Sequence, residues 1–178
     1  MPVETHNVLF LCTHNSARSV LSESILNHLN DRQFKGFSAG STPRGTVNPL
    51  ALEVLQNNGH DISNLRSQSW DDFAGPDAAP IHFVFTLCDD AAGEACPYWP
   101  GAPIKDHWGM SDPSRVAGGE VEQRKAFAKT YDLLTEHMAK FVDTVKQTPA
   151  DQLDARIKAL SEAFRAQSKS ILTPHVTT

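Results

Sequence analysis

The sequence predicts an α/β fold, a three-layer arrangement in which a four-stranded parallel sheet is flanked by helices, with an extra C-terminal helix. Two observations lead to this prediction. Residues 7–11 and 81–87 are short continuous apolar runs, which are typical of strands buried on both faces of a parallel sheet. Segments with apolar residues at helical spacing alternate with these runs along the chain, and such alternation builds β-α-β units.

The individual elements follow from local patterns. We expect strands at 7–11, 34–39, 81–87 and 104–108, and helices at about 17–29, 49–59, 120–145 and 151–167. Pro49 suits the first turn of a helix, and Gly59 is a typical helix stop. We divide the chain into a core domain, residues 1–147, and a C-terminal amphipathic helix with its tail, residues 148–178. That helix can pack on its own domain, pair with another subunit or dock a partner.

Length and composition narrow the classes of function. One domain accommodates 178 residues, and the net charge of −5 disfavours a general affinity for nucleic acid or anionic membranes. No apolar run approaches the roughly 20 residues of a membrane span, and the first residues lack the pattern of a signal peptide. We therefore expect a cytoplasmic protein, either a monomer or a homodimer. Three cysteines in such a protein indicate redox, catalytic or plain core roles rather than a disulfide framework.

The stretch VLFLCTHNSARS, residues 8–19, carries the strongest functional signal. Cys12 leaves a predicted parallel strand at the carboxyl edge of the sheet, where α/β proteins place their ligands. N–H groups of the next loop and of the helix start can converge on an anion, and Arg18 adds a forked cationic donor. We predict that this environment lowers the pKa of Cys12, which then acts as a nucleophile. The predicted oxyanion-binding loop consists of Thr13, His14, Asn15, Ser16, Ala17, Arg18 and Ser19.

The spacing of these residues is the C-x5-R-S pattern of the low-molecular-weight protein tyrosine phosphatases. The stretch CTHNSARS resembles more closely the arsenate reductases that are built on the same fold. The family loop usually has glycine where this chain has His14, so His14 must adopt the backbone angles of the loop without glycine's freedom. We expect Asn15 to hold the shape of the loop and Ser19 to donate a hydrogen bond to the thiolate.

Two further cysteines bear on the choice of chemistry, because reduction of arsenate needs two electrons and two thiols supply them by forming a disulfide. Cys88 ends the run HFVFTLC as Cys12 ends NVLFLC, so parallel strands would bring both to one edge of the sheet. The segment VFTLCDDAAGEACPYWP resembles the redox segment of the arsenate reductases, with seven residues between Cys88 and Cys96 where a family member has six. The segment KDHWGMSDPS also resembles the family in its H-W-G and D-P elements.

This resemblance implies a mechanism. Cys12 attacks arsenate held by the loop and Arg18, and Asp112 protonates the departing oxygen. Cys88 then attacks the Cys12 adduct, arsenite leaves and a Cys12–Cys88 disulfide forms; Cys96 attacks Cys88 and moves the disulfide outward, where a thioredoxin reduces it. In a second route, a small thiol such as glutathione or mycothiol takes the second step and glutaredoxin-type proteins complete the cycle. The sequence leaves both routes open.

Two other functions stay open at this stage. One is a tyrosine phosphatase that hydrolyses aryl phosphates, and the other is a non-catalytic regulator that binds an oxyanion. Phosphatases of this fold usually have tyrosine after their D-P pair, whereas Ser114 follows Pro113 here, which favours the reductase.

The residues predict no metal site and no tightly bound cofactor, only an external thiol reductant. The histidines and cysteines show no zinc-ligand spacing. Some thioredoxin-coupled relatives bind potassium near the catalytic loop. Asn15, Glu23 and Ser38 match positions used there, but Gln68 stands in place of the remaining carboxylate. The sequence therefore leaves potassium open as a ligand, with an incomplete set of matching residues.

Overall fold

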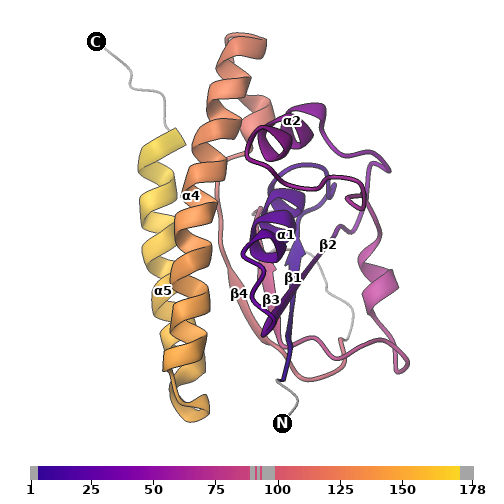
Figure 1. Ribbon diagram of the computed structural model, residues 1–178, viewed down its shortest axis with the longest axis vertical. Coiled ribbons are helices and arrows are strands. Elements are labelled where there is room, and N and C mark those ends of the chain that lie inside the picture. The colour runs from indigo at the N-terminus through magenta and orange to yellow at the C-terminus, as the bar shows by residue number, and fades with distance from the viewer. Residues whose placement is uncertain (1–3, 89–90, 92, 94–98, 173–178) are drawn as a thin grey trace.

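A parallel sheet organises the computed structural model, which describes residues 4–88, 91, 93 and 99–172 (Figure 1). The strand order is β2-β1-β3-β4, and every neighbouring pair is parallel. The strands are β1 (His6–Leu11), β2 (Phe34–Ala39), β3 (Phe83–Thr86) and β4 (Ile104–His107). The predicted four-stranded parallel sheet is confirmed, although β3 covers only the central part of the run 81–87.

Helices connect and cover these strands. They are α1 (Arg18–His28), α2 (Pro49–Asn57), α4 (Glu120–Gln147) and α5 (Ala150–Leu172), with the 3-10 helices η1 (Trp70–Phe73) and η2 (Pro113–Arg115). The side chain of Asn48 caps α2 by accepting the N–H of Leu50 at 2.9 Å, and Pro49 follows in the first turn as predicted. Sequence reasoning missed η1 and η2, because three or four residues are too few to show a hydrophobic period. Within the described ranges, no helix combines the length and apolar character that crossing a membrane requires.

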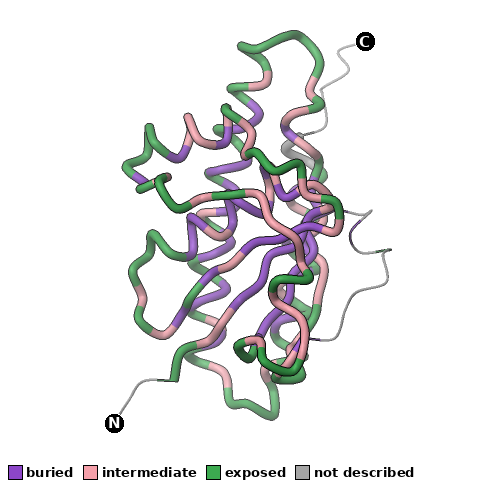
Figure 2. The backbone as a smooth tube through the Cα atoms, turned by 90° about the vertical axis from the view of Figure 1, so that its right-hand side faces the viewer, coloured by how far each residue is buried: buried purple, intermediate pink, exposed green. Residues whose placement is uncertain are grey.

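Both faces of the sheet are covered, because successive side chains of a strand point to opposite faces. Val8 and Phe10 of β1 belong to a large core that they share with α1, α2, α4 and α5. Leu9 and Leu11 belong to a second cluster, which contains Trp99 and is flanked by side chains of η1. Strands β1, β2 and β3 are accordingly buried along most of their length, whereas the edge strand β4 is only partly buried and the outer loops are exposed (Figure 2).

Helix α5 packs on its own domain, the first of the three arrangements considered for it. Ile157, Ser161, Phe164 and Ser168 are almost fully buried, and their spacing of four, three and four residues places them on one side of the helix. Figure 1 shows α5 running back antiparallel to α4, so that its last turns lie at the level of the carboxyl ends of the strands. The C-terminal helix and the core domain therefore share one hydrophobic core.

Candidate active site

The two predicted thiols meet at the carboxyl edge of the sheet. Cys12 directly follows β1, and Cys88 follows β3, which is the immediate neighbour of β1. The N–H of Leu87 donates to the carbonyl of Leu11 at 2.8 Å, so the pairing of the two strands continues to their tips. Both cysteines are buried and free, and each is the largest influence on the pKa of the other, so the two thiols lie next to each other. The expectation that both emerge on the same edge of the sheet is confirmed.

The loop after Cys12 turns its carbonyl groups outward. The carbonyls of Thr13, His14 and Ser16 accept hydrogen bonds from the N–H groups of Thr42, Arg44 and Asn48, at 2.9, 3.1 and 2.8 Å. Because all peptide bonds here are trans, the N–H that follows each of these carbonyls points the opposite way, into the loop. The loop therefore presents several N–H donors to its interior, as a site for an oxyanion requires.

Asn15 fixes this conformation, as predicted. It has a φ of 44°, in the left-handed region that asparagine tolerates better than most residues. Its Oδ1 accepts the N–H of Gln68 at 2.8 Å, and its Nδ2 donates to the Oγ of Ser19 at 2.9 Å. Ser19 is thus an acceptor that braces the loop from inside α1. His14 lies outside the left-handed region and needs no glycine-like freedom; its Nδ1 lies 3.2 Å from the Thr42 carbonyl.

Gly40 lets the end of β2 approach the loop closely. A Cβ at this position would lie 2.5 Å from the Thr13 carbonyl oxygen and 2.6 Å from that of Cys12, closer than any side chain allows. Since both contacts are with backbone, the loop itself would have to move to make room. Sequence reasoning missed this supporting role of Gly40.

The electrostatics of the thiol pair differ from the prediction. The hydrogen bond from Cys12 is the largest influence on Cys88 and, with the N–H and hydroxyl of Thr13, lowers the pKa of Cys88 to about 5. The same bond and burial raise the pKa of Cys12 well above its usual value, although Arg18 opposes them. The prediction of a lowered pKa at Cys12 is wrong for this arrangement, because two sulfurs in contact share one proton and the Thr13 donors favour the negative charge on Cys88.

Arg18 and Asp112 face each other across the site. Arg18 Nη2 lies 3.5 Å from Asp112 Oδ2, and Nη1 donates to the Met110 carbonyl at 2.8 Å. The Oδ1 of Asp112 accepts the N–H and the hydroxyl of Ser114 at 2.9 and 2.6 Å. Burial raises the pKa of Asp112, but the Ser114 hydrogen bonds and the charges of Arg18 and Arg115 outweigh it, so the pKa lies below its usual value. Without a ligand, Asp112 is therefore ionised at neutral pH.

These groups line a cavity of about 730 Å³ that also reaches Met110, Val116 and Ala117. Its walls carry four further cationic side chains, Arg44, Arg115, Lys125 and Lys129. The same walls carry the acids Asp112 and Glu122, the latter 3.2 Å from Lys125, so cations still outnumber acids and the cavity favours an anion although the whole protein is acidic. None of these four cations was predicted, and the Met110 carbonyl that holds Arg18 could not have been, because a backbone acceptor leaves no signal in the sequence.

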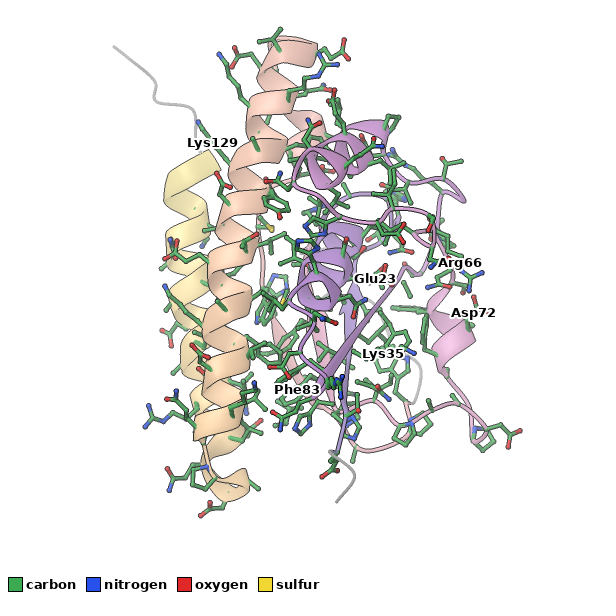
Figure 3. All side chains as sticks on the ribbon, viewed as in Figure 1. Glu23, Lys35, Arg66, Asp72, Phe83 and Lys129 are labelled. Atoms are coloured by element: carbon green, nitrogen blue, oxygen red, sulfur yellow. The ribbon has the colours of Figure 1, made fainter. Side chains whose placement is uncertain are left out.

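Several oxygens at the positions matched to a potassium site already accept hydrogen bonds from the protein. The Gln68 side-chain amide donates to the Ser38 carbonyl at 3.0 Å, and the Gln68 backbone N–H donates to the Asn15 Oδ1. Glu23 Oε1 accepts the Ser38 N–H at 3.1 Å. Burial raises the pKa of Glu23 to about 7, and the hydrogen bonds from Ser38 and the charge of Arg66 oppose this rise only partly (Figure 3). Hard cations need several free oxygen ligands, whereas protein donors already contact the Asn15 Oδ1, the Ser38 carbonyl and the Glu23 Oε1. Across the described part of the chain, no cluster of three or more histidine, cysteine, aspartate or glutamate side chains is placed to hold a metal ion.

Cys96, the third predicted thiol, lies outside the described residues. Its place in a relay therefore stays a prediction.

The comparisons with known proteins agree on the family. Residues 7–151 match the family model described as low molecular weight phosphotyrosine protein phosphatase. An arsenate reductase of Bacillus subtilis is 35% identical over 144 residues, which cover 81% of this chain and 100% of that protein. All of α5 beyond residue 151 lies outside the family match.

Solved structures of two activities share the fold. A thioredoxin-dependent arsenate reductase of Corynebacterium glutamicum has a TM-score of 0.59 and 24% identity; the match covers 82% of this chain and 64% of that one. A low molecular weight phosphotyrosine phosphatase of Vibrio cholerae has a TM-score of 0.63 and 20% identity, with 80% and 97% covered. At these identities the structures establish the fold and do not choose between the two activities.

Proposed function

The chain belongs to the low molecular weight phosphotyrosine protein phosphatase family, and from that premise we propose that it is a thiol-dependent arsenate reductase, which converts arsenate to arsenite. The observation that carries the proposal is the placement of Cys12 and Cys88 at the ends of the paired strands β1 and β3, where both line one cavity with Arg18 and the oxyanion loop. Ester hydrolysis needs one nucleophilic sulfur, whereas a two-electron reduction needs a second sulfur within reach of the first. This placement provides that second sulfur without any rearrangement of the sheet.

In the first step, Cys12 condenses with arsenate bound by the loop N–H groups and Arg18. An S–As bond forms, an As–O bond breaks, and the oxygen leaves as water. The Cys88 thiolate is hydrogen-bonded to Cys12 and serves as the base that takes the proton as the S–As bond forms. Asp112 donates a proton to the departing oxygen. Bound arsenate raises the pKa of Asp112 because it brings negative charge beside the carboxylate and engages Arg18.

In the second step, the Cys88 thiolate attacks the sulfur of Cys12. The Cys12–Cys88 disulfide forms, the S–As bond breaks, and its electron pair stays on arsenic, which leaves as arsenite. Two thiols are oxidised by two electrons in total and arsenic(V) is reduced to arsenic(III). The N–H and hydroxyl of Thr13 lie 3.4 and 3.6 Å from the Cys88 sulfur and keep it in the thiolate form that this attack requires.

The cycle closes when an external thiol reductant reduces the disulfide. In the relay, Cys96 attacks Cys88 and a thioredoxin-type protein reduces the resulting bridge; in the mixed route, a small thiol attacks the Cys12 adduct before a glutaredoxin-type protein acts. Both routes need a reducing compartment, which fits a cytoplasmic location. The close pairing of Cys12 with Cys88 favours the relay, because the internal thiol has a far higher effective concentration than an external one.

Disulfide mapping tests the proposal. Reduced protein is mixed with arsenate, quenched with an alkylating reagent and analysed by peptide mass spectrometry, while arsenite is measured separately. We expect a Cys12–Cys88 or Cys88–Cys96 bridge in proportion to the arsenite formed. Cys88→Ser should release no arsenite without an added small thiol, and Cys12→Ser should neither form a bridge nor bind arsenic. A Cys12 adduct with glutathione or mycothiol would point to the mixed route.

The same variants distinguish a reductase from a phosphatase, which could use Cys12, Arg18 and Asp112 in its own reaction. A phosphatase should hydrolyse an aryl phosphate equally well in the wild type and in Cys88→Ser, and it should produce no arsenite. That pair of results would overturn the reductase. Slow hydrolysis of the aryl phosphate together with arsenite formation would agree with the reductase, because the loop and Arg18 bind phosphate and arsenate in the same way.

A further inference from the structure

The C-terminal helix reaches the segment that carries the candidate acid. Three consecutive residues, the last of β4 and the two that follow it, each make one hydrogen bond to α5. Arg165 Nη1 donates to the His107 carbonyl at 2.7 Å, Trp108 Nε1 donates to Ser161 Oγ at 3.0 Å, and Ser168 Oγ donates to the Gly109 carbonyl at 2.9 Å. These bonds follow the buried side of α5 over about two turns, from Ser161 to Ser168, and fix the start of the loop that leads to Asp112.

The segment held by α5 is rigid for a second reason. Trp108 is fully buried, stacks on Phe85 at 3.9 Å between ring centroids and contacts Phe164 of α5. Gly109 lies against the imidazole of His107, and a Cβ at position 109 would collide with it. The His107 ring is itself 2.7 Å from Thr86 Oγ1, so it has little room to yield. The backbone of residues 107–109 therefore transmits the position of α5 to the residues that follow.

The next residue is part of the oxyanion site. Met110 donates its N–H to the Leu87 carbonyl at 3.2 Å and accepts Arg18 Nη1 through its own carbonyl, and Asp112 follows two positions later. Ser168 thus holds the Gly109 carbonyl, and the next carbonyl along the chain, that of Met110, orients Arg18. The path from α5 to the guanidinium consists of hydrogen bonds and covalent bonds only.

We propose that α5 is a positioning element of the active site: Arg165 and Ser168 hold residues 107–109 and thereby set the Met110 carbonyl and Asp112 against Arg18. Helix α5 lies beyond the part of the chain that matches the family, so this support is an addition to the common fold. Neither residue touches the oxyanion, and each acts through the loop. The inference uses the oxyanion site of the proposed function but does not depend on its redox chemistry.

The test compares Arg165→Gln and Ser168→Ala in the full-length protein with Leu153→Ala as the matched control. Leu153 packs on the same core from the first turn of α5, about 22 Å along the helix axis from Ser168, so its truncation loosens the helix without touching the loop. Two quantities are measured: the dissociation constant for inorganic phosphate by calorimetry, and the single-turnover rate of arsenate-driven disulfide formation. Melting temperatures report the loss of stability in each variant.

We expect each of the two positioning variants to weaken phosphate binding and to slow the single turnover by about three- to tenfold, the effect of one lost hydrogen bond. Arg165→Gln also loses the ion pair with Asp106 of β4, 3.8 Å away, so Ser168→Ala is the cleaner of the two variants. The control should lose as much stability or more while both quantities stay within about twofold. Arg165→Lys, which keeps a donor for the His107 carbonyl, should recover part of the loss. Arg165 is about one-third exposed, so replacing it leaves the fold intact.

The outcomes separate this inference from the proposed function. If phosphate binding weakens in Arg165→Gln and Ser168→Ala but arsenate is not reduced even by the wild type, the positioning role stands and the reductase falls. If the wild type reduces arsenate and the two variants match the Leu153→Ala control in binding and rate, the positioning role is overturned and α5 only stabilises the fold.

Discussion

Thr13→Val is a sharp probe of how the site prepares its second sulfur. Valine has nearly the shape of threonine and keeps the backbone N–H, which lies 3.4 Å from Cys88 Sγ, but it removes the hydroxyl at 3.6 Å. When Cys88 is ionised, only the hydroxyl can donate in this contact. The variant therefore removes one donor from the thiolate, and because this hydrogen bond is one of the causes of the lowered pKa, the pKa of Cys88 must rise.

The structure sets the size of the effect. A hydrogen bond to a charged group contributes about 1.5–3 kcal/mol, and one pKa unit corresponds to about 1.4 kcal/mol. The contact at 3.6 Å is long, so we take the low end, a rise of about one unit from the value of about 5. At about pH 5.5 the thiolate fraction then falls about threefold, whereas at about pH 8 it is near one in both proteins.

Single-turnover disulfide formation with arsenate measures this directly. The ratio of the variant's rate to the wild-type rate cancels the titration of arsenate itself. We expect the ratio to be near one at about pH 8 and about one third at about pH 5.5. Thr42→Val, on the exposed neighbouring segment, is the control and should give a ratio near one throughout. A ratio for Thr13→Val that does not change with pH would refute the assignment of the low pKa to a thiolate held by Thr13.

Three further predictions follow from other parts of the structure. Arg18→Lys keeps the charge but loses the fork that contacts the Met110 carbonyl and Asp112, so calorimetry should show phosphate binding weakened about 10- to 100-fold; an unchanged affinity would contradict this. Exchanging sodium for potassium at constant ionic strength should change neither the turnover rate nor the melting temperature, because the Gln68 amide occupies the Ser38 carbonyl; a clear rise in either would restore the ion site. Burial lowers the pKa of His137 to about 3, so between about pH 6.5 and 3 the unfolded chain binds more protons and the free energy of unfolding falls with falling pH, by up to about 4–5 kcal/mol. His137→Phe should flatten this slope in urea unfolding at a series of pH values, and an unaltered slope would assign it to other groups.

Most of the fold was predictable from the sequence, because its signals are local and repeated. The residues of β2 coincide with the predicted 34–39, and α1, α2 and α4 differ from the expected helices by a few residues at their ends. Helix α5 continues five residues beyond the predicted end at 167, because its last turns are stabilised by tertiary hydrogen bonds from Ser168 and Arg165 that no periodicity reveals. Tertiary contacts decide such ends, whereas the apolar pattern decides that the helix exists.

The candidate site was predictable at its reactive positions but not in its charge distribution. Cys12, Arg18, Cys88 and Asp112 stand at the ends of elements or in a recognisable motif, and the structure brings all four to one cavity. The sequence placed a cation near Cys12 and correctly implied a lowered pKa at this site, but on the wrong sulfur. That assignment depends on the donors of Thr13, which contact the sulfur of the neighbouring strand.

The location of the charge on Cys88 also bears on the order of the chemical steps. An ionised Cys12 would place its charge on the atom that arsenate must approach, where repulsion is strongest, although Arg18 opposes this repulsion. With the proton on Cys12, the charge of the thiol pair stays in the cavity but lies on Cys88, one atom farther from the incoming anion, and the loop offers a neutral sulfur and N–H donors. The proton moves to Cys88 only as the S–As bond forms, and its loss to solvent then leaves Cys88 ready to attack. A single shared proton therefore keeps the two sulfurs from being nucleophiles at the same time, which orders the attack on arsenic before the attack on sulfur.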